Sequence, residues 1–233
     1  MNLLTRGITD VTELFFPALC VTCGNRLITQ EKYLCMPCWH DIPATNFHLN
    51  PENKVAQLFW GRVEIENAAA YFSYKKGSRY QDLIHFIKYK GLKELAFIAG
   101  RKYGFELLNS AEFRAVDVVV PVPLHPKKLK KRGFNQSEWI ANGIAETLQK
   151  PVVSDNLFRR IFTSTQTKKN RFERWQNVED IFDLNDCTQF IGQHVLIVDD
   201  VVTTGSTLEA CAFSILKCEN AKVSIATLGF ADY

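Results

Sequence analysis

Val195-Leu-Ile-Val-Asp-Asp-Val-Val-Thr-Thr-Gly-Ser-Thr207 is the stretch that decides the fold. Its first four residues form an unbroken apolar run, which is typical of a parallel strand buried on both faces. Beyond the hydroxyl-rich loop, apolar residues recur at helical spacing, namely Leu208, Cys211, Ala212, Ile215 and Leu216. The stretch therefore predicts a strand, an acid pair, a loop and a helix, and open α/β sheets bind ligands at the carboxyl ends of such strands.

The loop Thr203-Thr204-Gly205-Ser206-Thr207 has the residue types that bind a phosphate. The first N–H groups of the following helix lack partners and carry the positive end of its dipole. Gly205 allows a positive φ or a close approach of the backbone. Asp199 and Asp200 start toward opposite faces of the strand and can accept hydrogen bonds from ribose hydroxyls. A simpler interpretation is an ordinary βα turn, in which Ser206 and Glu209 form a capping box.

All thirteen residues resemble the phosphoribosyl-pyrophosphate (PRPP) signature of type I phosphoribosyltransferases. The resemblance implies that Asp199 and Asp200 contact the ribose hydroxyls and that residues Thr203, Thr204, Gly205, Ser206 and Thr207 hold the 5′-phosphate. It also implies PRPP with Mg²⁺ as the ligand. The expected fold class is therefore α/β, with a parallel sheet flanked by helices.

Length and charge agree with this expectation. The 233 residues suffice for one α/β domain and a small module, and the net charge of +3 suits an anionic ligand without arguing for nucleic acid. The sequence contains no apolar run of about 18 residues, so we expect no membrane-spanning helix. The N-terminal segment carries Arg6, Asp10 and Glu13 and has no apolar signal core, so we expect a cytoplasmic protein. Seven cysteines in such a chain indicate metal ligands or free thiols before disulfides.

Four of these cysteines form two pairs, Cys20-x2-Cys23 and Cys35-x2-Cys38. Two such knuckles are typical of a tetrahedral Zn²⁺ site, and four thiolates leave no open position, so the metal would be structural. The alternatives are four reduced cysteines or a redox pair. His40 is a spare ligand candidate, although a surface or packing role suits it better. We assign residues 1–45 to a zinc-finger module and residues 46–233 to the α/β domain.

Between the two regions, the pattern predicts strands over 68–74 and 116–120. Helices are expected over 78–89, from 91 toward 108, and from about residue 136. Residues 41–67 contain Pro43 and Pro51 and are interpreted as a connector with an irregular start to the next domain.

A basic loop is predicted after the strand that ends at Pro121-Val-Pro123. It contains His125, Lys127, Lys128, Lys130, Lys131 and Arg132. A loop at this end of a neighbouring strand is well placed to meet the pyrophosphate of PRPP, with His125, Lys127 and Arg132 as candidates. The alternative is a solvated basic surface.

Residues 121–137 resemble the signature of the ComF-type competence-protein family, whose members pair a phosphoribosyltransferase-like domain with an N-terminal four-cysteine zinc finger. The similarity runs in order across nearly the whole chain and also takes in residues 20–38, 87–91, 165–182 and 195–207. Within it, the polar and basic residues 159–174 stand where phosphoribosyltransferases carry a loop that closes over PRPP and excludes water. Lys169, Arg171 and Arg174 could there meet the pyrophosphate, and the alternative is a flexible surface loop.

Two functions follow. The first is transfer of the phosphoribosyl group from PRPP, with Asp199 and Asp200 as the candidate catalytic residues and electrostatic stabilisation as the main source of catalysis. An amidophosphoribosyltransferase is the nearest analogy, but the chain starts Met1-Asn-Leu3, so we expect no glutaminase domain with an N-terminal cysteine. The second is a competence or DNA-uptake accessory protein that binds single-stranded DNA, with other competence proteins as partners, through the basic stretches 127–132 and 159–174 and nearby aromatics. The sugar-phosphate pocket would then serve recognition only.

Overall fold

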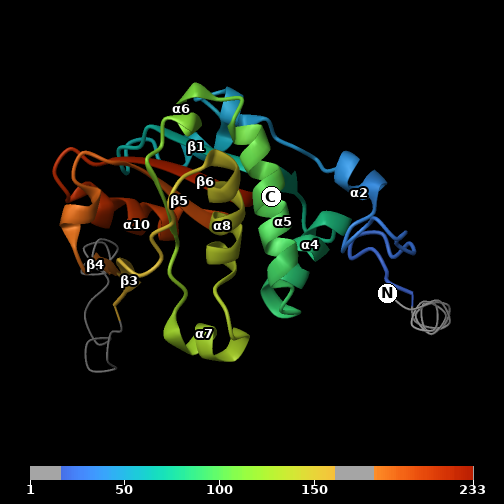
Figure 1. Cartoon of the computed structure of the whole chain (residues 1–233). Coiled ribbons are helices and arrows are strands. Elements are labelled where there is room, and N and C mark those ends of the chain that lie inside the picture. Colours follow the sequence, from blue (N-terminus) through green and yellow to red (C-terminus); the bar gives the residue numbers. More distant parts are fainter. Residues whose placement is uncertain (1–16, 161–180, 233) are drawn as a thin grey trace.

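Four parallel strands form the central sheet in the computed structural model, which describes residues 17–160 and 181–232 (Figure 1). The strand order is β1-β6-β5-β2, with bounds β1 Asn67–Tyr74, β2 Val118–Pro121, β5 His194–Val202 and β6 Lys222–Ala231. The predicted strands are therefore confirmed, with one difference at the site. The strand β5 continues to Val202 because β6 offers its backbone a partner as far as the pair Val202↔Phe230. Both acids thus lie within the strand and not after it.

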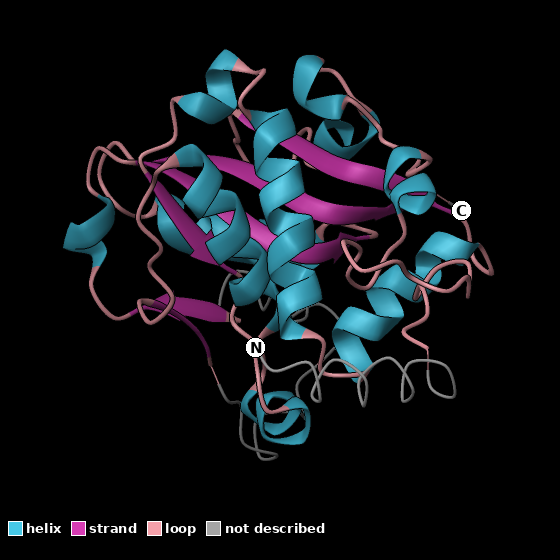
Figure 2. Cartoon of the chain, turned by 45° about the vertical axis from the view of Figure 1, so that its right-hand side comes forward, coloured by secondary structure: helices cyan, strands magenta, loops and turns pink. Residues whose placement is uncertain are grey.

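Helices cover both faces of the sheet (Figure 2). One buried cluster joins the sheet to α4 (Arg79–Tyr89), α5 (Lys93–Leu107) and α8 (Gln136–Leu148). A second cluster joins the other face to α10 (Ser206–Leu216) and α3 (Lys54–Gln57). The expected helices are confirmed to within two residues at their starts. The parallel sheet between helices is the α/β fold that the sequence predicts.

Shorter elements connect these layers. They are α2 Met36–His40, η1 Phe47–Leu49, α6 Ala111–Arg114, α7 Pro126–Arg132, β3 Leu157–Arg159, β4 Phe182–Leu184 and η3 Cys187–Phe190. The strands β3 and β4 pair antiparallel in a sheet of their own. In the described parts of the chain, no helix is both long and apolar enough to span a membrane. The cytoplasmic location stays a prediction.

The basic segment after β2 is a helix, and the prediction of a loop there was wrong. Pro126 occupies the first turn of α7, where its missing N–H costs nothing, and His125 Nδ1 accepts a hydrogen bond from Lys127 N at 3.1 Å. Gly133 ends the helix with φ +77°. The lysines between these caps are good helix formers. A run of charged residues can therefore form a helix even though it has no apolar periodicity.

Residues 41–67 are more ordered than a connector. Asn53 caps α3 by accepting hydrogen bonds from Val55 N and Ala56 N, and its side-chain N–H donates to Ala68 O of β1 at 2.7 Å. The segment therefore folds against the sheet through contacts that are far apart in sequence. No local periodicity reports such contacts.

The cysteine-bearing segment packs against α4 and α5. Cys20, Cys35 and Cys38 belong to the same buried cluster as the apolar faces of these helices. Tyr80 of α4 donates a hydrogen bond to Cys38 O at 3.2 Å, and Lys32 forms an ion pair with Glu94 of α5. The boundary at residue 45 stays a prediction, but the two predicted parts share one core.

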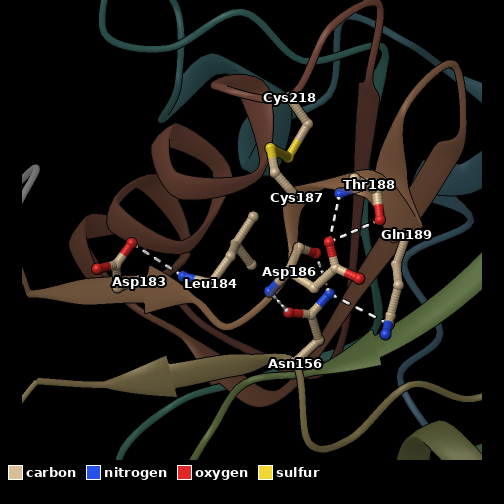
Figure 3. The surroundings of a disulfide bond; sticks show 8 residues. All are labelled: Asn156, Asp183, Leu184, Asp186, Cys187, Thr188, Gln189 and Cys218. Carbon is tan, nitrogen blue, oxygen red and sulfur yellow. Dashed lines mark hydrogen bonds between the residues drawn. A yellow bond between two sulfur atoms is a disulfide. The ribbon is translucent and has the colours of Figure 1, made fainter.

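A disulfide joins Cys187 and Cys218, whose Cα atoms are 5.4 Å apart (Figure 3). The expectation of metal ligands or free thiols was wrong for this pair. The two cysteines meet because η3 lies beside the end of α10, and the sequence separation of 31 gives no sign of it. A hydrogen-bonded group surrounds the bond, in which Asn156 Nδ2 donates to Asp186 O at 2.7 Å and Asp186 accepts from Thr188 N at 2.8 Å.

Candidate functional site

A pocket opens where β5 gives way to α10. It is lined by Asp199, Val201, Val202, Thr203, Thr204, Gly205, Ser206, Thr207 and Leu208. The structure thus brings the five predicted loop residues and Asp199 together. The four hydroxyl side chains of the loop are exposed to solvent. The pocket therefore presents hydroxyl donors and the start of a helix, and both favour an anion.

Gly205 shapes this loop. Its φ is +78°, and it is the N-cap residue of α10 without a side chain to cap the helix. A Cβ built on Gly205 would lie 3.0 Å from Cε1 of the buried Phe59. The positive φ favours glycine, and the Cβ of any other residue would also press against the Phe59 ring. The predicted capping box needs Ser206 as the N-cap residue, but α10 starts one residue earlier, with Gly205 as its N-cap, and Glu209 pairs with Arg62 instead.

Asp199 is the acid that faces the pocket. It is half-buried, and its Oδ1 accepts hydrogen bonds from Ser137 Oγ at 2.7 Å and from Asp200 N at 2.8 Å. Burial and the neighbouring charge of Asp200 raise the pKa of Asp199 to about 7. This carboxyl group therefore titrates near neutral pH and is available to a ligand in the pocket.

Asp200 points to the other face of β5, as the alternation of a strand predicts. It is 4% exposed, and its two oxygens accept from Lys88 Nζ at 3.0 Å and from Gln136 Nε2 at 2.8 Å. Burial lowers the pKa of Lys88, but the charges of Asp200 and Asp199 more than offset this, so the pKa is raised overall. In this arrangement Asp200 does not line the pocket, and its ribose contact stays a prediction.

Lys88 and Arg62 were both missed by sequence reasoning. Lys88 stands in the segment 87–91 that resembles the ComF-type family, but its type and spacing gave it no role. Arg62 lies in the segment that was interpreted as a connector. It donates to Thr204 O at 2.9 Å and pairs with Glu209, so it supports the loop from behind.

Three of the predicted pyrophosphate candidates, His125, Lys127 and Arg132, are described, and they do not line this pocket. His125 caps α7, Lys127 is exposed, and the Arg132 guanidinium lies 5.1 Å from the Tyr89 ring centroid. The helix α7 lies at the lower end of the molecule, below α8, in Figure 1. Lys169, Arg171 and Arg174 lie outside the described residues. The roles of all six candidates stay predictions.

The four cysteines at the N-terminal side form a second site. Their sulfur atoms all lie within 4.8 Å of one another, and Cys23 and Cys35 Sγ are 3.6 Å apart. Burial alone would raise the pKa of Cys20, but backbone N–H groups of Cys35, Cys23 and Thr22 lower it to about 6. Four close sulfurs of which one is stabilised as a thiolate fit a metal such as zinc. His40 is exposed and stands outside the cluster.

Comparison with known proteins places these features in a family context. A model of the phosphoribosyl transferase domain matches residues 135–231. The DNA utilization protein YhgH of Escherichia coli (strain K12) is 32% identical over 213 residues, covering 89% of this chain and 88% of that protein. Competence protein F of Haemophilus influenzae is 32% identical over 118 residues, which are 50% of each chain. Competence protein ComFC of Bacillus subtilis is 38% identical over 112 residues, or 48% of this chain and 43% of that protein.

Proposed function

Because this chain belongs to the ComF-type family of competence and DNA-utilization proteins, we propose that it binds PRPP with Mg²⁺ and transfers the phosphoribosyl group to an acceptor. The observation that carries the proposal is the pocket lined by Asp199 and the loop 203–207. The loop would hold the 5′-phosphate at the start of α10, and Asp199 would accept a hydrogen bond from a ribose hydroxyl. Mg²⁺ would accompany the pyrophosphate, and Zn²⁺ would be held by the four cysteines.

The side chains of this protein would stabilise the charges that develop during transfer and would not act as nucleophiles. Loss of pyrophosphate leaves a ribosyl cation, and a carboxylate beside the ribose stabilises positive charge. Asp199 is the described acid that lines the pocket. The pyrophosphate would be neutralised as it leaves by the predicted candidates His125, Lys127 and Arg132, and by Lys169, Arg171 and Arg174, which lie outside the described residues.

Calorimetric titration with PRPP and Mg²⁺, followed by an assay of pyrophosphate release with candidate amine and base acceptors, tests this function. We expect saturable binding that Asp199→Asn weakens at least tenfold, because the ribose loses a charged hydrogen-bond acceptor. Asp82→Asn removes an exposed acid of α4 and is the matched control. Binding that is unchanged in Asp199→Asn would contradict the site assignment. A double variant, Asp199→Asn with Asp200→Asn, that still released pyrophosphate would contradict the catalytic assignment.

A second function, binding of single-stranded DNA, is favoured by the surface around α7. Lys127, Lys128, Lys130 and Lys131 are exposed there. Beside them, Arg132 stacks on Tyr89, which is 59% exposed. Exposed cations next to an accessible aromatic ring are typical of surfaces that contact phosphates and stack bases.

Binding of a labelled oligothymidylate at several salt concentrations tests this surface. We expect affinity to fall steeply with salt, because phosphate contacts release counterions. The variant Lys130→Glu with Lys131→Glu should weaken binding, whereas Lys217→Glu with Lys222→Glu, two exposed lysines outside this surface, should not. Affinity that stays flat with salt, or equal losses in the two variants, would exclude the α7 surface.

A further inference from the structure

The phosphate-binding loop of the proposed function is supported from behind by the segment 58–62. The buried Phe59 ring is in contact with the position of Gly205, and Leu58 lies against it as well. Arg62 follows at the end of the same turn. This segment is far from the loop in sequence, so its contacts with the loop are a tertiary feature of the fold.

Arg62 reaches the loop and the first turn of α10 with its whole guanidinium group. Nη1 donates to Leu58 O and to Thr204 O, both at 2.9 Å. Nη2 lies 3.4 Å from Ser206 Oγ and pairs with Glu209 Oε2, while Nε donates to Glu209 Oε1 at 3.2 Å. A planar fork that binds a carboxylate and two carbonyl oxygens together fixes geometry in a way that a lysine cannot.

Glu209 is the residue through which the position of Arg62 affects the affinity for a phosphate. It is 9% exposed and lies in the first turn of α10, the helix whose start lines the pocket. A negative charge there opposes the binding of a phosphate, because the low dielectric of a buried position screens it poorly. Arg62 is the cation that pairs with it among the described ion pairs.

We propose that Arg62 is a positioning residue of the phosphate site, which holds the backbone of the loop and cancels the charge of Glu209. The inference rests on the proposed function, since it names what makes that pocket fit for a phosphate dianion. The competing interpretation is a structural tie that joins two segments and has no effect on the charge at the pocket. The two interpretations differ in what removal of Glu209 does to a variant that lacks Arg62.

The test measures the affinity for ribose 5-phosphate by calorimetry, and the unfolding midpoint in urea, for four variants of the full chain. We expect Arg62→Met to weaken binding at least tenfold, because the loop loses its support and Glu209 is left unpaired. Glu209→Gln alone should stay within about threefold of the unmodified protein. The double variant should bind ribose 5-phosphate clearly more tightly than Arg62→Met. The affinity of Arg62→Lys should lie between the affinities of these two variants.

Arg101→Met is the matched control, because Arg101 pairs with Glu146 between α5 and α8 and does not line the pocket. Its affinity should equal that of the unmodified protein. If Arg62→Met does not fold, the double variant, which buries no unpaired charge, still allows the comparison with Glu209→Gln. An affinity in Arg62→Met within threefold of the unmodified protein, or a double variant no better than Arg62→Met, would overturn the inference. If the unmodified protein binds neither ribose 5-phosphate nor PRPP, the proposed function itself fails.

Discussion

Gly205 is constrained by its backbone conformation and by its contact with Phe59, and replacing it should affect both stability and binding. Gly205→Ala should lower the free energy of unfolding by about 1–2 kcal/mol, because an L-residue at φ +78° is strained. It should also weaken ribose 5-phosphate binding, since the new Cβ pushes against Phe59 and displaces the loop. Urea unfolding and calorimetry measure the two effects.

Gly192→Ala is the control for this prediction. Gly192 also has a positive φ, +66°, but a Cβ there would meet nothing within 4 Å, and Gly192 does not line the pocket. It should therefore show the cost in stability without the loss of affinity. Equal affinities in the two variants would show that the contact with Phe59 does not shape the pocket.

Asp199 gives the protein a dependence of stability on pH. Burial and the charge of Asp200 raise its pKa to about 7 in the folded state, whereas an unfolded aspartate has a pKa of about 4. Between these values the folded protein holds a proton that the unfolded chain has lost. Stability therefore falls as pH rises from about 4 to 7, and the loss is complete above pH 7.

Asp199→Asn should remove this loss, because asparagine keeps an oxygen that accepts from Ser137 and carries no charge. We expect the variant to be more stable than the unmodified protein by roughly 1–2 kcal/mol at pH 8, and much less so at pH 4. Urea unfolding at the two pH values measures the difference. The same variant should bind ribose 5-phosphate more weakly, so stability and affinity change in opposite directions. A stability difference that does not vary with pH would contradict the raised pKa.

At the scale of elements, the contact between α5 and α8 depends on glycine. A Cβ at Gly143 of α8 would overlap with the backbone of Phe97 and Arg101 in α5. Helix propensity alone predicts that Gly143→Ala stabilises the protein by about 1 kcal/mol. Overpacking typically costs about 1–3 kcal/mol, and here the obstacle is backbone, which cannot move aside.

We therefore expect Gly143→Ala to destabilise the protein, as measured by the midpoint of thermal or urea unfolding. Asn142→Ala, at the neighbouring half-buried position, should be neutral or slightly stabilising. A stabilised Gly143→Ala variant would mean that the two helices are not held at this close distance.

The elements show which parts of the fold could be predicted from the sequence. The strands β1, β2 and β5 and the helices α4, α5, α8 and α10 have long apolar patterns, and they were predicted near their observed bounds. The helix α7 was missed because its charge run is not amphipathic, although Pro126 and Gly133 mark its ends. The segment 53–63 was missed because Asn53, Phe59 and Arg62 act through partners that are remote in sequence.

The residues of the candidate site also fall into those that could be predicted from the sequence and those that could not. Its loop could be predicted because local chemistry, a helix start after hydroxyls and a glycine, is written in consecutive residues. Lys88 and Arg62 reach the site from other elements, and a single sequence does not show which charges meet. The disulfide between Cys187 and Cys218 was missed for the same reason.

At the scale of the whole molecule, the cysteine site should stabilise more than its own segment. Cys20, Cys35 and Cys38 belong to the buried cluster that also contains the apolar faces of α4 and α5. A metal that joins the four sulfurs would therefore couple the N-terminal segment to the core of the α/β domain. The whole described fold, and not a separate module, should respond to removal of the metal.

We expect metal analysis of the purified protein to find about one zinc per chain, because four cysteine sulfurs form one tetrahedral site. A strong chelator should lower the urea midpoint of the main unfolding transition, followed by tryptophan fluorescence, and zinc should restore it. Cys35→Ser should lose the metal and show the same lowered midpoint. Cys211→Ser is the control, since Cys211 is a buried cysteine of α10 outside the cluster, and this variant should keep its zinc. A metal-free protein with an unchanged midpoint would show that the cluster does not stabilise the core it is packed against.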